Sequence, residues 1–185
     1  VYVVEKKDRG KGSFNYSNSI KKTDAIITNA NDITLFSYYA DCVPLYFYDK
    51  ENRIIGLAHS GWKGTLKRIG LKVLKKMKDE FDSKISDCLV AIGPAISRDF
   101  YEVDNKLVNK FRNNFSNIND YLFYKGKNNY LLDLPGIVKM MFLKAGIKSE
   151  NIIESNMCTY SNKENFYSYR RDKGVTGRMA SIITL

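Results

Sequence analysis

Histidine is almost absent from this chain, because His59 is the only one among 185 residues. A site that needs two or more imidazoles therefore cannot be assembled from these residues alone. Cysteine is also scarce, and the three thiols, Cys42, Cys88 and Cys158, are odd in number and far apart. This pattern argues against a disulfide framework and favours a reducing compartment.

Long apolar stretches are missing as well. A membrane helix needs roughly 18–20 apolar residues, and the longest candidate stretch, 26–40, is interrupted by Asn29, Asn31 and Asp32. The chain opens on Val1, with neither an initiator Met nor a recognisable signal peptide. We therefore expect an intracellular, cytoplasmic globular protein that does not engage a membrane.

Acidic residues are outnumbered, at 20 against 30 basic residues, which gives a formal net charge of +10. Of the basic residues 22 are Lys and only 8 are Arg, and they fall mostly in loops and on one expected helix face. A nucleic-acid site usually combines Arg with exposed aromatic side chains. The charge pattern therefore favours a small anionic substrate over a specific nucleic-acid partner.

Strand-favouring runs dominate the chain, and several follow one another without a helix between them. They are Val1–Val4, Ala25–Thr28, Thr34–Tyr39, Val43–Tyr48, Ile54–His59, Cys88–Ile92, Tyr130–Leu132, Ile152–Glu154 and Met179–Leu185. Helical spacing marks one stripe through Leu66, Ile69, Val73, Met77 and Phe81, and further helices are expected near Asp104–Phe115 and Pro135–Ala145. This order predicts an α+β fold with mixed sheets flanked by helices.

Cys42 and His59 are the first candidate site residues. Pro44 interrupts a sheet ladder, so Cys42 is expected at a strand end, facing a cleft. If the strands flanking the turn at 49–53 form a hairpin, Cys42 and His59 lie opposite one another at its open end. A thiolate and an imidazole there can act as nucleophile and base, or bind a metal ion. The alternative is structural, since a single Cys is commonly a small buried hydrophobe.

Cationic side chains occur in two Gly-containing segments. Lys63 lies between two glycines directly before a helix, where the backbone can approach a ligand and free N–H groups face an anion. Arg170 and Arg171 offer planar donors suited to phosphate or carboxylate. A surface ion pair of one of these arginines with Asp172 is the structural alternative.

Four other residues are further candidates. Cys88 lies in an apolar run and is expected in the core. Cys158 either lines the same cleft as Cys42 or is structural. Glu102 and Asp133 are candidate acids with no evident partner.

Several segments together resemble a known family, the laccase-domain or multicopper polyphenol oxidase-like proteins, now described as purine nucleoside phosphorylases. The matching segments run in family order along the chain: Thr23–Asn29, Ala40–Pro44, Ala58–Thr65, Ile92–Ile96, Tyr101–Val103, Leu132–Leu134, Cys158–Thr159 and Ser168–Asp172. The resemblance implies a layered α/β/β/α fold, also seen in toxin deamidases with a Cys–His pair.

The resemblance also implies a mononuclear metal site, usually zinc with copper possible, formed by one Cys and two His. Cys42 and His59 match two of these ligands. The third belongs to a Gln-x-His-type motif upstream of the position of Val1, so we expect residues 1–185 to be a single domain lacking its N-terminal part. Lys63 stands where the family usually carries Arg.

The activity implied is a purine nucleoside phosphorylase acting on adenosine, inosine, guanosine or methylthioadenosine, with adenosine deaminase activity. Nucleoside and phosphate would be the small-molecule partners, and Lys63 and Arg170 are the expected phosphate-binding residues. Cys42 and His59 are the expected catalytic and metal-binding residues. We reject true multicopper oxidation, because a trinuclear cluster needs several more imidazoles than this chain holds.

Two alternative functions stay open from the sequence. The first is a thiol hydrolase that acts on an amide such as a cell-wall precursor, with Cys42 as nucleophile and His59 as base. The second is a non-catalytic binding module whose basic surface engages an anionic partner. The sequence does not indicate the oligomeric state.

Overall fold

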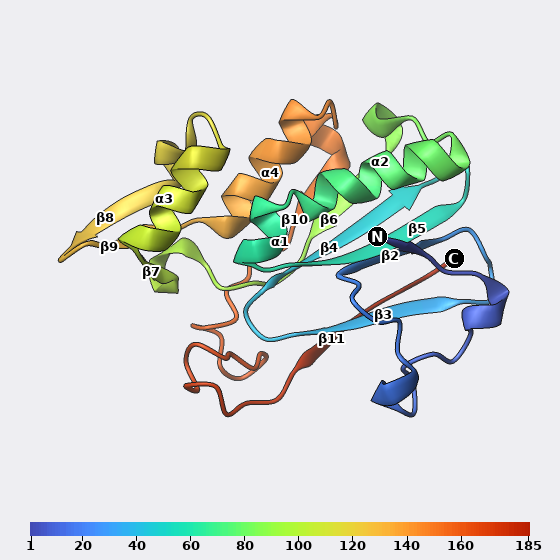
Figure 1. Cartoon of the computed structure of the whole chain (residues 1–185), viewed down its shortest axis with the longest axis horizontal. Coiled ribbons are helices and arrows are strands. Elements are labelled where there is room, and N and C mark those ends of the chain that lie inside the picture. Colours follow the sequence, from blue (N-terminus) through green and yellow to red (C-terminus); the bar gives the residue numbers. More distant parts are fainter.

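A six-stranded mixed sheet forms the centre of the structure, a computed structural model that describes residues 1–185 (Figure 1). Its strands lie in the order β1-β2-β5-β4-β6-β10. The bounds are β1 (Tyr2–Val3), β2 (Ala25–Thr28), β4 (Val43–Asp49), β5 (Ile54–Ser60), β6 (Leu89–Ile92) and β10 (Ile152–Glu154). The two outer pairs, β1–β2 and β6–β10, are parallel, and the three inner pairs are antiparallel.

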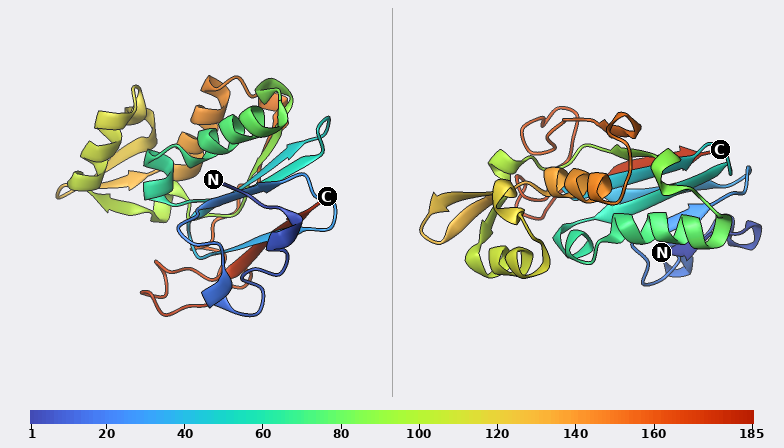
Figure 2. Two further views of the ribbon diagram at one scale, coloured as in Figure 1. Left: turned by 45° about the vertical axis from the view of Figure 1, so that its right-hand side comes forward. Right: turned by 90° about the horizontal axis from the view of Figure 1, so that it is seen from above.

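Three helices pack on one face of this sheet: α1 (Trp62–Leu66), α2 (Ile69–Phe81) and α4 (Leu134–Lys144) (Figures 1 and 2). Helix α4 begins where its sequence favours a start, because the Asp133 carboxylate accepts the Gly136 N–H (2.9 Å) and Pro135 occupies the first turn. The ring of Phe142 on α4 packs edge-on against Phe47 of β4. This contact fixes the helical layer on the sheet.

A two-stranded antiparallel sheet of β3 (Thr34–Tyr39) and β11 (Met179–Thr184) covers the opposite face (Figure 1). The phenol of Tyr39 donates a hydrogen bond across the layers to the carbonyl of Ala58 (3.3 Å). The observed layer order is therefore helices, large sheet, small sheet. No α-helix of residues 1–185 forms a fourth layer outside β3 and β11.

The third sheet lies at one end of the molecule, with strand order β7-β9-β8, and α3 packs beside it (Figure 2). The bounds are β7 (Glu102–Asp104), α3 (Asn105–Asn114), β8 (Leu122–Gly126) and β9 (Asn129–Leu132). One cluster of 28 buried side chains runs without interruption from Ala25 through the large sheet to Phe111 of α3. The end sheet is therefore part of the main core.

The structure confirms the predicted α+β class and most predicted elements, and it corrects three details. The stripe from Leu66 to Phe81 is divided into two helices, because Arg68 adopts a left-handed conformation (φ 54°). Its guanidinium donates to the carbonyl of Asn114 (2.8 Å) and lies over the ring of Phe115, and these contacts hold the break. The short strands β7 and β8 were not predicted.

The third correction concerns the β4–β5 hairpin. Val43 pairs with Ser60 and Pro44 with His59, so Cys42 aligns with Gly61 and not with His59. The predicted register was wrong by two residues. Such a slip keeps each side chain on its predicted face, so the two candidate residues still share one face at the open end.

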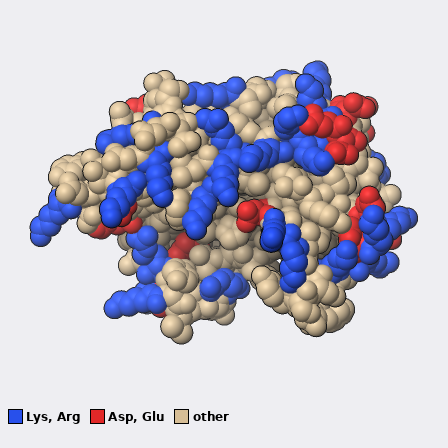
Figure 3. All heavy atoms as spheres, in the orientation of Figure 1, with Lys and Arg blue, Asp and Glu red and all other residues tan.

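No helix in this chain has both the length and the apolar composition to cross a membrane. Lys and Arg side chains spread over the face that carries α2 and are interspersed with acidic groups at one end (Figure 3). On α2, Lys75 pairs with Asp79 and Lys76 with Glu80. The basic helix face thus has the solvated character expected of it.

Candidate functional site

Cys42 ends the short connection in which the chain passes from the small sheet (β3) to the large sheet (β4). Its neighbour Asp41 has φ 83°, the left-handed region that non-glycine residues rarely adopt. This conformation lets the chain change sheets within three residues. As a result, the Cys42 thiol lies beside the end of β5.

His59 lies near the end of β5, and Gly61 follows directly after the strand. A Cβ on Gly61 would lie 2.8 Å from the Cys42 Sγ and 3.9 Å from the His59 Nε2, so both atoms border the space that this glycine leaves open. The Thr65 hydroxyl donates to the Gly61 carbonyl (3.0 Å) and lies 3.0 Å from the Ser60 hydroxyl. These buried contacts hold the backbone of Gly61 beside the thiol and the imidazole.

Burial keeps both groups neutral. It raises the pKa of the Cys42 thiol to about 11, and the negative charge of Asp41 adds to the effect. Burial also lowers the pKa of the His59 imidazole, against a smaller opposing influence of Asp24. The ring of Tyr39 packs edge-on against His59, with centroids 5.2 Å apart. At neutral pH the pair is therefore a thiol and a neutral imidazole, not a thiolate–imidazolium ion pair.

The donor chemistry of this pair suits a metal ion. Zinc binds Cys sulfur at about 2.3 Å and His nitrogen at about 2.0 Å, and both atoms border the space beside Gly61. No group of three or more His, Cys, Asp or Glu side chains placed to hold a metal exists in residues 1–185. Cys42 and His59 thus fit two positions of a metal site and do not complete one.

Arg170 reaches the site from the C-terminal loop. Its backbone N–H donates to the Asp41 carboxylate (2.7 Å), and its guanidinium donates to the Glu102 carbonyl (2.7 Å) and lies 5.2 Å from the centre of the Tyr101 ring. One guanidinium N–H is used in this way, and the others have no protein acceptor. Arg170 is therefore anchored at its backbone and still able to bind an anion.

Tyr101 is a site residue that the sequence reasoning missed, apart from its place in a family motif. Burial raises the pKa of its phenol to about 12, as does the nearby Cys42, while Arg170 opposes the rise. The hydroxyl stays protonated and forms no hydrogen bond within the protein. Tyr101 thus presents a free donor close to the thiol, and no spacing rule could have indicated it.

Lys63 lies on α1, two residues beyond Gly61. It is exposed, it has no acidic partner, and its ammonium lies 5.3 Å from the centre of the Trp62 ring. The Lys110 ammonium of α3 lies at the same distance from that ring. Lys63 thus contributes positive charge at the start of α1 without a direct contact to Cys42 or His59.

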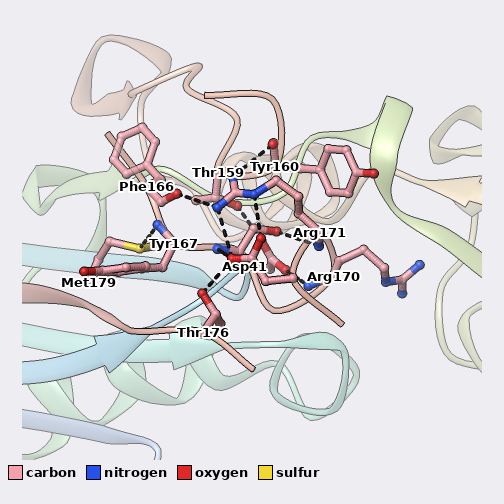
Figure 4. A network of polar contacts seen from close by, with 11 residues as sticks. Asp41, Thr159, Tyr160, Phe166, Tyr167, Arg170, Arg171, Thr176 and Met179 are labelled. Atoms are coloured by element: carbon pink, nitrogen blue, oxygen red, sulfur yellow. Dashed lines mark hydrogen bonds and ion pairs between the residues drawn. The ribbon is translucent and has the colours of Figure 1, made fainter. Parts of the chain in front are cut away.

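Arg171 forms the ion pair with Asp172 that is the structural alternative to ligand binding. Its guanidinium pairs with Asp172 (2.8 Å) and donates to the carbonyls of Thr159, Tyr160 and Phe166 (Figure 4). These bonds use its planar donor set to shape the C-terminal loop. Arg171 is therefore not available to a ligand.

Three other candidates are structural as well. Cys88 is fully buried in the core, as predicted. The Asp133 carboxylate caps α4, and the Glu102 carboxylate bonds to Lys125 and Asn129 at the surface. Neither carboxylate forms a hydrogen bond with Cys42.

Cys158 lies in a different environment from Cys42 and Cys88. Its backbone forms an isolated parallel β-bridge with Ala95. Its sulfur accepts from the N–H and the hydroxyl of Ser97, at 3.4 and 3.1 Å. Burial acts to raise the pKa of this thiol, but the hydrogen bonds from Ser161 and Ser97 outweigh it and lower the pKa. Cys158 is thus the most acidic of the three thiols.

A hollow of about 830 Å³ has His59 among its lining residues. It lies between the 8–24 segment and β3, and Asp24, Leu35 and Tyr38 are among its lining residues. Cys42 does not line it. Of the two candidate residues, only His59 therefore borders this hollow.

Solved structures share this α+β architecture. A Bacillus licheniformis protein titled hypothetical protein YfiH superposes with a TM-score of 0.97 at 35% identity, over all of this chain and 70% of its own. YlmD from Geobacillus stearothermophilus superposes with a TM-score of 0.94 at 33% identity, over 99% of this chain and 68% of its own.

The family described as multi-copper polyphenol oxidoreductase laccase matches residues 1–185, and the chain belongs to that family. Among its curated relatives, the purine nucleoside phosphorylase YlmD of Bacillus subtilis is 40% identical over 183 residues, which are 99% of this chain and 66% of the relative. A Staphylococcus saprophyticus purine nucleoside phosphorylase is 34% identical over 68% of its length. The chain thus spans about two thirds of the length of these relatives.

Proposed function

We propose that the protein carrying this chain is a metal-dependent purine nucleoside phosphorylase. The observation that supports this best is the meeting of Cys42 and His59 at the open space beside Gly61, with Arg170 anchored close by and free to bind an anion. The names of the curated relatives agree with this chemistry. We further propose that residues 1–185 act as one domain and that the protein works in the cytoplasm.

In phosphorolysis a phosphate oxygen forms a bond to C1′ of the ribose while the bond from C1′ to the purine nitrogen breaks. The purine leaves and gains a proton. Positive charge develops on the sugar, so the phosphate must be held beneath C1′ by cationic donors. Arg170 has free N–H groups in the planar arrangement that phosphate prefers, and Lys63 adds charge at the start of α1.

Cys42 and His59 would hold the metal, together with a third ligand that residues 1–185 do not contain. When bound, a zinc ion of this kind supplies a Lewis acid and an activated water, as adenosine deamination requires. Because burial lowers the pKa of His59, its imidazole is neutral and keeps one ring nitrogen unprotonated, so that nitrogen can serve as a ligand. The Tyr101 hydroxyl stays protonated and can donate to the nucleoside or to the leaving purine.

The thiol hydrolase is the alternative enzyme, and the electrostatics disfavour it. An activated Cys nucleophile needs a lowered pKa, whereas burial raises that of Cys42 to about 11. Inactivation by iodoacetamide at Cys42 that persists after complete metal removal would support the hydrolase.

The test is to incubate the protein with inosine or adenosine, with and without inorganic phosphate, and to measure free purine, ribose phosphate and ammonia. We expect purine release that depends on phosphate, and ammonia from adenosine without phosphate. Cys42→Ser and His59→Gln should lose bound metal and turnover together. Cys158→Ser is the matched control and should keep both.

Two results would overturn the proposal. One is purine release that does not depend on phosphate. The other is a Cys42→Ser protein with unchanged activity, which would favour a non-catalytic binding role for this site.

A further inference from the structure

Asp41 combines two unfavourable features directly before Cys42. Its φ is 83°, and its side chain is buried, with 8% of the residue exposed. The nine other non-glycine residues with positive φ are all exposed. Strained backbone and a buried carboxylate each cost free energy, so their coincidence at one residue indicates a specific role.

The contacts of Asp41 show what holds it there. One carboxylate oxygen accepts the Thr159 hydroxyl and the other accepts the Arg170 backbone N–H, both at 2.7 Å. The Asp41 carbonyl accepts the N–H of Ile96 (3.0 Å). No Lys, Arg or His side chain forms an ion pair with this carboxylate. Three segments that are distant in sequence thus converge on the residue before Cys42, and Figure 4 shows the contacts with Thr159 and Arg170.

Arg170 is the partner with chemical consequences. Its backbone is held by Asp41, while its side chain extends away from the network in Figure 4. The guanidinium then meets Tyr101 and the Glu102 carbonyl. Because the base of a flexible side chain is fixed, the positions open to its guanidinium are limited to the side of the site that Tyr101 forms.

We propose that Asp41 is a positioning residue that sets Arg170 against Cys42 for anion binding. The inference rests on the proposed function, in which Arg170 binds phosphate. Thr159 bonds to the same carboxylate but has no contact with the Arg170 guanidinium. Loss of the Arg170 hydrogen bond should therefore weaken phosphate binding, whereas loss of the Thr159 hydrogen bond should not.

Three variants separate these roles. Asp41→Gly keeps the positive φ without strain and removes both hydrogen bonds. Asp41→Asn can still offer its carbonyl oxygen to the Arg170 N–H and its amide to the Thr159 hydroxyl. Thr159→Val removes only the hydrogen bond from the Thr159 hydroxyl to the Asp41 carboxylate and is the matched control.

We expect Asp41→Gly to raise the KM for phosphate by at least about tenfold, the effect of one charge-assisted hydrogen bond, with a smaller change in the KM for nucleoside. Asp41→Asn and Thr159→Val should stay within about threefold of wild type. Combined with Arg170→Ala, Asp41→Gly should add nothing to the phosphate defect, since both changes remove one function. Metal content should match wild type in every variant.

An unchanged phosphate KM in Asp41→Gly, or a defect that adds to that of Arg170→Ala, would overturn the inference. So would an equal defect in Thr159→Val, which would make the carboxylate a general support of the loop. Equilibrium binding of inorganic phosphate, measured by calorimetry, separates this inference from the function. Phosphate binding that is lost in Asp41→Gly, in a protein without phosphorolysis, would refute the function and support the positioning role. A wild type that binds no phosphate would refute both.

Discussion

Gly61→Ala tests whether the open space between Cys42 and His59 is used. The backbone of Gly61 has φ −75° and ψ −179°, which any residue adopts, so alanine brings no backbone strain. The added Cβ would lie 2.8 Å from the Cys42 Sγ, well inside van der Waals contact. The thiol must therefore rotate away from His59, or the start of α1 must move.

Overpacking of this kind costs about 1–3 kcal/mol, whereas relief of glycine flexibility in the unfolded chain returns about 0.4–1 kcal/mol. In the metal-free protein rotation of the thiol relieves most of that contact, so global stability should change little. A bound metal ion must hold the thiol against the added Cβ. Metal affinity should therefore fall by roughly 5- to 150-fold, which corresponds to the overpacking cost of about 1–3 kcal/mol. Gly64→Ala is the control, because its Cβ would meet the His59 carbonyl (3.1 Å) and not the thiol.

The assay is metal affinity from competition with a chelator, together with the thiolate-to-metal absorption of the cobalt-loaded protein and a thermal melt. We expect Gly61→Ala to lose affinity and shift the absorption at a nearly unchanged Tm, while Gly64→Ala keeps the wild-type affinity. Wild-type affinity and spectrum in Gly61→Ala would refute the reasoning, since the space beside the thiol would then be irrelevant to the ion.

Three further predictions follow from the same structure. In metal-free protein between roughly pH 7 and 10, iodoacetamide should modify Cys158 before Cys42, because hydrogen bonds lower the pKa of the first thiol and burial raises that of the second. Mass mapping checks this order, and earlier reaction of Cys42 would contradict it. Phe142→Ala should lose about 3–5 kcal/mol in urea unfolding, since the ring is fully buried, whereas the neighbouring, 41% exposed Leu143→Ala should lose less than about 1 kcal/mol. Arg171→Lys should speed amide exchange across residues 159–178 by at least roughly tenfold, because lysine cannot replace the planar set of donors. Unchanged exchange would show that the loop does not depend on this guanidinium.

Local pattern was sufficient for most strands and for the existence of the hairpin, but not for its register. The bounds of β2, β3 and β10 were predicted without error, because alternation and β-branched residues mark half-buried strands. The break at Arg68 was not predictable, since it depends on contacts with Asn114 and Phe115, which lie far away in sequence. β7 and β8 bury one side chain each and contain a single β-branched residue between them, Val103, so neither carries the signal that marks β2, β3 and β10.

The candidate site was also predictable from the sequence only in part. Cys42 and His59 share a hairpin, so their proximity followed from chain pairing even with the register wrong by two residues. The contact of Asp41 with Arg170 spans 129 residues, and nothing in local spacing reports such a pairing. Residue chemistry singled out Arg170 and motif resemblance included Tyr101, but only the structure shows Arg170 as anchored and Tyr101 as an unpaired donor.

The burial of Cys42 indicates its chemical role more specifically than the sequence motif or the residue spacing does. Raising its pKa from 9.0 to about 11 makes the free thiolate about 3 kcal/mol harder to form, which weakens it as a nucleophile at neutral pH. A bound cation offsets that cost directly, because it supplies the positive charge that the buried sulfur lacks. The neutral, partly buried His59 meets the same requirement, since a metal takes imidazole only in its unprotonated form. The two environments therefore favour ligand chemistry over thiol catalysis, and they predict that metal uptake releases one proton per site, all of it from Cys42. A pH-stat or buffer-dependent calorimetric titration near pH 7 would measure that proton, and uptake without release would mean that Cys42 is not a ligand.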